Sequence, residues 1–212
     1  MGAKFFNRLS SPEVQARIEE LDLAYKKEEA YRLSQQKKAA QLADIERLGG
    51  KRQYEDFRKD NYTNTHILSA MSNYPQENYY LWGAAGTGKT HAAVAVARNL
   101  KQARLIRMAQ ISRMFRKDIS SEQEEKYIRL FASIPLVLDD IGSEKMTDFL
   151  QGVLFEIIDR RWSNKTGGLI ITANMSIANL AKIVGDRTAS RIAGLVGAKN
   201  VLEISGTDKR LG

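Results

Sequence analysis

Residues 83–90 read Gly83-Ala84-Ala85-Gly86-Thr87-Gly88-Lys89-Thr90, which fits the pattern G-x-x-x-x-G-K-[ST] of loops that bind nucleotide phosphates. The residues before the loop, 79–82, are aromatic and apolar, as expected of a buried strand. The residues after it, 91–100, are rich in alanine and favour a helix. A strand, a glycine loop and a helix in this order form the context that the motif requires. These flanks argue against a chance glycine loop.

The residue types in this loop suit the binding of a triphosphate such as ATP. Glycines at 83, 86 and 88 let the backbone aim its N–H groups at one small volume without Cβ clashes. The helix that starts near Lys89 adds the positive end of its dipole. The Lys89 ammonium would contact the outer phosphates, and the Thr90 hydroxyl would be a ligand for Mg²⁺. We therefore expect the nucleotide to be bound by Gly83, Ala84, Ala85, Gly86, Thr87, Gly88, Lys89, Thr90 and the adjoining His91.

Length, composition and charge restrict the class of protein. The chain has 212 residues, of which 43% are hydrophobic and 27% charged, enough for one domain and an appendage. No apolar run reaches the roughly 18 residues of a membrane span, and the first residues lack the apolar core of a signal peptide. The absence of cysteine excludes disulfides and cysteine zinc sites, and favours a reducing, cytoplasmic location. A net charge of +8 predicts a polyanion partner, nucleic acid above all, with a merely soluble basic surface as the alternative.

Residues 1–50 differ from the rest of the chain. Ser11 and Pro12 suit the first turn of a helix, and Gly49-Gly50 suits its end. Apolar residues recur at helical spacing and predict a stripe that weakens in the middle of the segment: Val14, Ile18, Leu21, Tyr25, then Leu42, Ile45 and Leu48. The segment is too thin to bury a core of its own. It therefore indicates a docking element for another protein, with a solvated helical tail as the alternative.

Strands and helices alternate through residues 51–212, which we take as one domain whose first residues, 51–57, form the linker into it. We expect helices near 64–72, 91–100, 110–118, 122–131 and 148–162 and around 185–191, and strands at 79–82, 103–108, 134–140, 169–174 and 201–204. The apolar face of the 148–162 helix is assigned to Phe149, Val153, Leu154, Ile157 and Ile158. This alternation predicts an α/β fold with a parallel sheet covered by helices on both faces.

Polar residues end two of these strands. The apolar run 134–138 leads into Asp139 and Asp140, the form of a Walker B element. Asp139 would hold Mg²⁺, and Asp140 would orient or deprotonate the attacking water. Parallel sheets of this class bind ligands at the carboxyl ends of their strands. Asn174 is therefore expected near the γ-phosphate, and its alternative role is to cap the next turn.

From residue 50 onward the chain resembles the AAA+ ATPases of the DnaC type, the replicative helicase loaders. The resemblance rests on the phosphate loop, Leu138 to Glu144, Thr172-Ala173-Asn174, Gly185 to Arg191, and the finish at Gly206-Thr207-Asp208-Lys209-Arg210. It implies a P-loop core without a helical lid domain. It also implies that residues 1–50 bind a hexameric replicative helicase.

The same resemblance assigns roles to single residues. Asn174 matches sensor 1, and Arg191 matches the finger that reaches a neighbouring copy's nucleotide during self-assembly. Arg210 matches a sensor 2-like arginine that faces the γ-phosphate. The helices between 110 and 131 match an insertion that touches single-stranded DNA in this clade. We expect that contact to use Arg113, Arg116 and Lys117.

Two departures from the family pattern affect these expectations. Many AAA+ enzymes carry Glu where this chain has Asp140, so hydrolysis is expected to be slow or to need a partner. The N-terminal segment has no zinc-ligand pattern, which implies a helical contact.

Two rival functions share these motifs. IstB-type ATPase partners of transposases have nearly the same ATP site but would act on duplex DNA. The second rival function is that of a degenerate adaptor, which binds nucleotide without turnover. It is disfavoured by the intact site residues Lys89, Thr90, Asp139 and Asn174.

Overall fold

The computed structural model describes residues 12–47, 65–115 and 119–208. The chain separates into two compact units, Met1–Ala43 and Asp44–Gly212. Several expectations lie outside the described residues: the Ser11 cap, Leu48, the Gly49-Gly50 stop, the boundary at residue 50, the linker 51–57, and the side chains of Arg116, Lys117 and Arg210. No helix in the described part of the chain is both long and apolar enough to cross a membrane.

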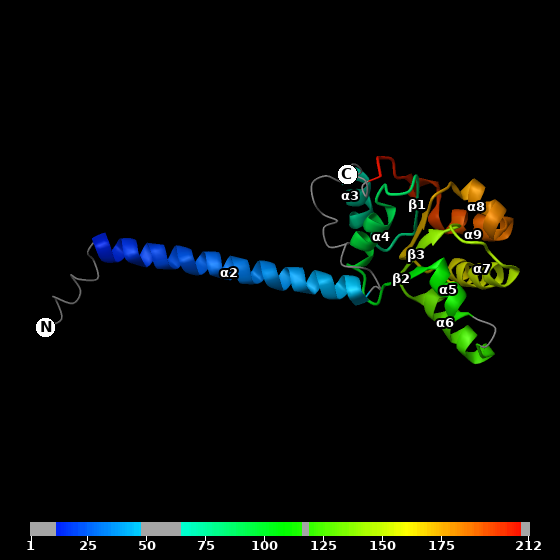
Figure 1. Cartoon of the computed structure of the whole chain (residues 1–212), viewed down its shortest axis with the longest axis horizontal. Coiled ribbons are helices and arrows are strands. Elements are labelled where there is room, and N and C mark those ends of the chain that lie inside the picture. The colour runs from blue at the N-terminus through cyan, green and yellow to red at the C-terminus, as the bar shows by residue number, and fades with distance from the viewer. Residues whose placement is uncertain (1–11, 48–64, 116–118, 209–212) are drawn as a thin grey trace. The chain divides into compact units, whose positions relative to one another are not determined.

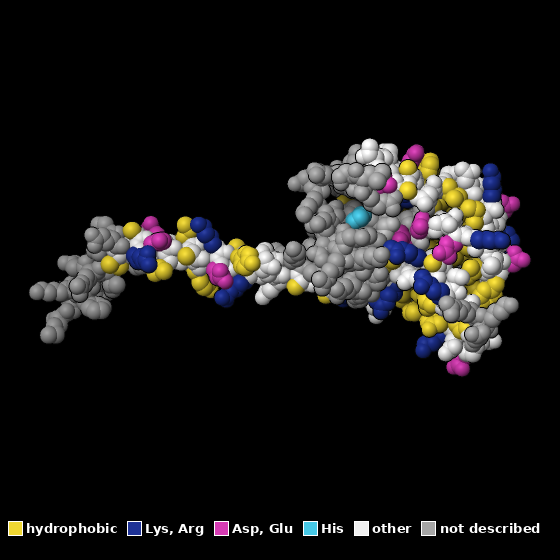
Figure 2. Space-filling model, in the orientation of Figure 1, with side chains coloured by type: hydrophobic (Ala, Val, Ile, Leu, Met, Phe, Trp, Pro, Cys, Tyr) yellow, Lys and Arg dark blue, Asp and Glu magenta, His cyan; other side chains and the backbone are white. Residues whose placement is uncertain are grey.

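The N-terminal segment is helical, as predicted: α2 is a single helix of 36 residues, Pro12–Arg47 (Figure 1). An apolar side chain also lies outside the predicted stripe, of whose members Ile18, Leu42 and Ile45 have side chains outside the described residues. Because successive residues are about 100° apart around a helix, Leu23 lies on the opposite side from Leu21 and Tyr25, and all three are exposed. Figure 2 shows hydrophobic, basic and acidic side chains interspersed along this helix. The helix therefore offers apolar contacts on more than one face.

The second unit is built on a five-stranded sheet of order β2-β3-β4-β1-β5, in which every paired strand is parallel. The strands are β1 (Tyr79–Trp82), β2 (Arg104–Arg107), β3 (Leu136–Ile141), β4 (Leu169–Ala173) and β5 (Val201–Glu203). All carboxyl ends therefore lie at one edge of the sheet. The predicted parallel α/β sheet is confirmed.

Helices cover both faces of this sheet, as expected (Figure 1). They are α3 (Thr65–Asn73), α4 (Lys89–Ala97), α5 (Met108–Met114), α6 (Ser121–Ser133), α7 (Asp148–Ser163), α8 (Ile177–Val184), α9 (Asp186–Val196) and the 3₁₀ turn η2 (Ala198–Asn200). Side chains alternate across a strand. Val137 packs in the core under α3 and α4, whereas Leu136 and Leu138 pack in the core under the helices α5–α9.

Three local expectations need correction. The helix expected at 110–118 is the shorter α5, which ends at Met114. The helix expected around 185–191 is a pair, α8 and α9, because Gly185 lies between them with φ +86°. Phe149 is 48% exposed, whereas Leu150 is buried. In the first turn of α7 the side chain that faces the core is therefore Leu150, one residue later than predicted.

Arg161 of α7 is buried in the protein core with 0% of its surface exposed. Its Nη1 donates to the carbonyl oxygens of Phe131 (2.7 Å) and Ile134 (2.8 Å), and its Nη2 donates to that of Gly167 (2.8 Å). Burial lowers the pKa of this guanidinium to about 10. It therefore remains charged at neutral pH and joins the end of α6 to the start of β4.

Candidate functional site

The glycine loop connects β1 to α4 and depends on the absence of side chains. Gly83 has φ +146° and Gly86 has φ +75°, in the region that favours glycine. A Cβ on Gly83 would overlap the carbonyl oxygen of Ile204, and one on Gly86 would overlap the Asp208 carboxylate. The loop therefore packs against the stretch that follows β5, which includes Asp208. The predicted Arg210 is two residues after Asp208 in the sequence.

Lys89, the first residue of α4, is only 7% exposed. Its Nζ donates to the carbonyl oxygens of Gly83 (2.9 Å) and Ala84 (2.6 Å), so the ammonium lies inside the curve of the loop. Thr87 Oγ1 also donates to Ala84 O (2.9 Å). Of the other predicted nucleotide contacts, Ala84 and Ala85 are exposed, and Gly86, Gly88, Thr90 and His91 are partly buried. This arrangement concentrates positive charge where a phosphate would enter.

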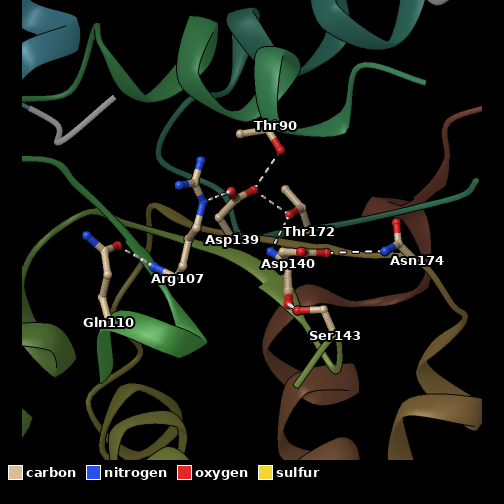
Figure 3. Close-up of polar contacts among 8 residues, drawn as sticks. All are labelled: Thr90, Arg107, Gln110, Asp139, Asp140, Ser143, Thr172 and Asn174. Carbon is tan, nitrogen blue, oxygen red and sulfur yellow. Dashed lines mark hydrogen bonds and ion pairs between the residues drawn. The ribbon is translucent and has the colours of Figure 1, made fainter. Parts of the chain in front are cut away.

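Asp139 lies at the centre of a buried polar network (Figure 3). Its Oδ1 accepts hydrogen bonds from Thr90 Oγ1 (2.7 Å) and from Thr172 Oγ1 (2.8 Å). Its Oδ2 accepts from Arg107 Nε at 3.2 Å. The structure thus brings together the two predicted Mg²⁺ ligands, Thr90 and Asp139, from α4 and β3.

Asp140 points away from Asp139 and toward the end of β4 (Figure 3). Asn174 Nδ2 donates to Asp140 Oδ1 at 3.2 Å, so these two predicted catalytic side chains are neighbours. Asp140 has φ +60°, an unusual backbone conformation for a residue with a Cβ. Its main-chain N–H donates to Thr172 Oγ1 (2.8 Å), and its carbonyl oxygen accepts from Ser143 Oγ (2.7 Å).

The oxygens of Thr90 and Asp139 fit Mg²⁺ by their chemistry. Hydroxyl and carboxylate oxygens are the hard ligands that this ion prefers, and it commonly takes only one or two side chains together with phosphate oxygens and water. Nowhere in the described ranges do three His, Asp or Glu side chains gather into a metal cage. The pair therefore suits an ion that arrives with a nucleotide.

Comparison with known families agrees with this geometry. The family model described as "IstB-like ATP binding protein" matches residues 8–211. The chain belongs to this family. The resemblance to DnaC-type AAA+ proteins and their IstB-like relatives is thereby confirmed, and ATP binding is the property that the family name states.

Curated relatives of this IstB-like chain include helicase loaders and ATP-binding proteins of insertion sequences. The replicative helicase loader DnaC of Escherichia coli (strain K12) is 26% identical over 153 residues, which are 66% of this chain and 62% of the relative. A putative ATP-binding protein of insertion sequence IS5376 from Geobacillus stearothermophilus is 31% identical over 117 residues, or 52% and 45%. The chain thus spans less than two thirds of the length of either relative.

Solved structures share the fold of this IstB-like domain. A crystal structure of the DnaC helicase loader has a TM-score of 0.58 at 22% identity, covering 73% of this chain and all of that one. A crystal structure of DnaI has a TM-score of 0.54 at 22% identity, with coverage of 72% and 87%. Both confirm the AAA+ core fold.

Two residues of the polar network were not among the predicted site residues: Arg107 and Thr172. Arg107 is the last residue of β2, and Thr172 belongs to β4. The rule that ligands lie at the carboxyl ends of parallel strands would have pointed to Arg107. Arg107 is also the N-cap of α5, and its N–H donates to Gln110 Oε1 at 2.9 Å. The site is therefore joined directly to the helix that carries Arg113.

Arg191 and Arg113 lie outside this network. Arg191 Nε donates to Asp159 Oδ1 at 2.9 Å, and its guanidinium lies 5.4 Å from the centre of the Trp162 ring. Its partners thus belong to α7 of the same chain. Arg113 is exposed on α5, where its Nε donates to the carbonyl oxygen of Ala109. Neither arginine is placed against the phosphate loop by these contacts.

Proposed function

We propose that this protein is an ATPase that loads a hexameric replicative helicase onto single-stranded DNA. One observation supports turnover above all. Asp139 is bonded to Thr90 of the phosphate-loop helix, while the adjacent Asp140 is bonded to Asn174. These are the two arrangements that metal binding and water activation need, at one edge of one sheet.

Each residue of the site has a role in this proposal. The loop from Gly83 to Thr90, with Lys89 and the adjacent His91, binds the phosphates of ATP. Thr90 and Asp139 hold Mg²⁺, which neutralises phosphate charge when bound. Asp140 accepts a hydrogen bond from the water that attacks the γ-phosphorus, and Asn174 orients that carboxylate. Arg210 faces the γ-phosphate from the C-terminal stretch.

The partners follow from the charge and from the N-terminal helix. We assign helicase docking to residues 1–50 and ATP chemistry to residues 51–212, in the cytoplasm. The exposed apolar side chains of α2 supply contact area that its own unit does not bury. Arg113, Arg116 and Lys117 contact single-stranded DNA through its phosphates. A second candidate function, ATPase partner of a transposase, is favoured by the IS5376 relative and by the family match.

Size-exclusion chromatography with light scattering separates the two functions. The protein is mixed with the replicative helicase of its host, with ATP and with ADP, and ATP turnover is measured on the same samples. We expect a complex that depends on the nucleotide and on α2. The absence of a complex with either nucleotide, together with binding to a transposase encoded beside this gene, would overturn the loader function.

Replacing Arg191 with alanine is expected to lower ATP turnover by about 100-fold or more under conditions where copies assemble. ATP affinity of the isolated chain should stay unchanged, because Arg191 contacts α7 and not the phosphate loop. Turnover is measured against protein concentration, and assembly by light scattering.

The control for Arg191 is Asp159→Asn, which removes the acidic partner and keeps the arginine. An arginine that acts on the nucleotide of a neighbouring copy does not need Asp159, so this variant should retain turnover. If Asp159→Asn and Arg191→Ala lose turnover equally, the local ion pair explains the effect and the finger assignment is wrong. Unchanged assembly and hydrolysis in Arg191→Ala would contradict it as well.

A further inference from the structure

Thr172 is the residue that contacts both carboxylate-bearing residues of β3. We propose that Thr172 is a positioning residue for Asp139 and Asp140, an inference that rests on the ATPase function proposed above. Its hydroxyl lies 2.8 Å from Asp139 Oδ1 and 2.8 Å from the main-chain nitrogen of Asp140 (Figure 3).

The direction of both hydrogen bonds follows from the chemistry of the partners. The Asp140 N–H can only donate, so the Thr172 oxygen accepts from it. The Thr172 O–H has one proton, and that proton is directed to Asp139 Oδ1, since an ionised carboxylate only accepts. Thr172 is 1% exposed, so no bulk water competes for either bond. The two carboxylate-bearing residues are thus held in a fixed relation by one oxygen atom.

The backbone of β3 explains why this hydroxyl is needed. Leu138 pairs with Ile171, but the next paired residue, Ile141, is opposite Ala173. Two residues of β3, Asp139 and Asp140, therefore face the single residue Thr172, which is the pattern of a β-bulge. A bulge leaves a main-chain group without its ladder partner. The Thr172 side chain supplies that partner for the Asp140 N–H.

This bond also holds Asp140 in its unusual conformation. At φ +60° the backbone turns the Asp140 side chain away from Asp139, toward Asn174. Asn174 is two residues beyond Thr172, so the same strand end supplies both the anchor and the partner of the Asp140 carboxylate. Loss of the hydroxyl would free Asp140 to leave this orientation while the phosphate loop stays intact.

Thr172→Val tests the inference, because valine keeps the shape of threonine and lacks the hydroxyl. We expect the turnover number to fall about 10- to 100-fold, the usual effect of removing an outer partner of a metal-binding carboxylate. The affinity for ATP without Mg²⁺ should stay within about twofold, because the phosphate loop is unchanged. The increase in affinity that Mg²⁺ causes should become smaller.

Thr172→Ser restores the hydroxyl and is expected to recover most of the turnover and the full effect of Mg²⁺. Thr188→Val is the matched control for changing a buried threonine, since Thr188 is buried in α9. Thr172→Ser and Thr188→Val should both retain the melting temperature of the starting protein within a few degrees. Full turnover in Thr172→Val, or equal loss in Thr172→Ser, would overturn the positioning role.

Hydrogen exchange of the Asp140 amide provides a readout that does not depend on activity. NMR should show a slowly exchanging amide in the starting protein and in Thr172→Ser, and a faster one in Thr172→Val. Equal protection in all three would overturn the inference. A starting protein without any ATP turnover would contradict the proposed function instead, and this exchange measurement would still decide the role of Thr172.

Discussion

Replacing Lys89 with alanine is expected to weaken ATP binding by about 100-fold or more, which corresponds to about 2.7 kcal/mol. The ammonium lies inside the curve of the loop, held by the carbonyl oxygens of Gly83 and Ala84. Because this position is buried, its charge acts on a phosphate with little screening by solvent. Titration of the protein with a fluorescent ATP analogue measures the loss.

Lys101→Ala is the matched control for Lys89. Lys101 is an exposed lysine that follows α4 at the opposite end from the loop, so it removes the same charge without touching the site. Its ATP affinity should match that of the starting protein. Normal ATP affinity in Lys89→Ala would contradict the nucleotide-site assignment, provided that circular dichroism shows a folded protein.

The second large effect is expected on stability, from Arg161→Met. Methionine fills much of the volume but leaves three carbonyl oxygens without their donor, that of Phe131 buried and those of Ile134 and Gly167 partly buried. Each unsatisfied group costs about 1–3 kcal/mol, and relief from burying a charge offsets part of this. We expect a net loss of about 3 kcal/mol in the free energy of unfolding, measured by denaturant titration.

Arg160→Met is the control for Arg161, because it changes the adjacent arginine of the same helix. The Arg160 side chain is partly exposed and pairs with Glu125 and Glu156. These bonds hold the pKa of Glu125 at about 2, yet ion pairs that water reaches add little to the stability of the fold. Equal destabilisation by Arg160→Met and Arg161→Met would contradict the role assigned to the buried guanidinium.

The pH dependence of the Arg161 effect follows from its pKa. The folded-state pKa is about 10 and lies below the ordinary pKa of arginine, so the side chain is protonated in both states at neutral pH. Between the folded-state pKa and the ordinary pKa, the unfolded chain binds more protons than the folded chain. Only in that range should the free energy of unfolding rise with pH because of Arg161. The difference between Arg161→Met and the starting protein should therefore be constant from about pH 6 to pH 9.

Much of the fold could be predicted from local patterns in the chain. The glycine loop needs no tertiary information, because main-chain sterics and phosphate chemistry require glycine, lysine and threonine at set spacings. The alternation of strands and helices likewise predicted a parallel sheet with its carboxyl ends at one edge. That rule predicts that Asp139, Asp140 and Asn174 lie near one another.

Other parts of the site depend on which strands are neighbours, and the sequence carries no such local signal. Arg107 and Thr172 reach Asp139 from 32 and 33 positions away in the chain, on the two strands that flank β3. Only the order β2-β3-β4 brings the three together. The bulge that makes Thr172 necessary is also a property of the pairing between β3 and β4.

The sequence alone thus determined the P-loop α/β class, the nucleotide-binding loop and the strand-end carboxylates, because these follow from short-range geometry of the backbone. The tertiary structure alone decided that Arg161 is buried while Arg160 is not, and that Leu150 rather than Phe149 faces the core. Such choices are made by packing between elements, where side chains of the same type reach different partners.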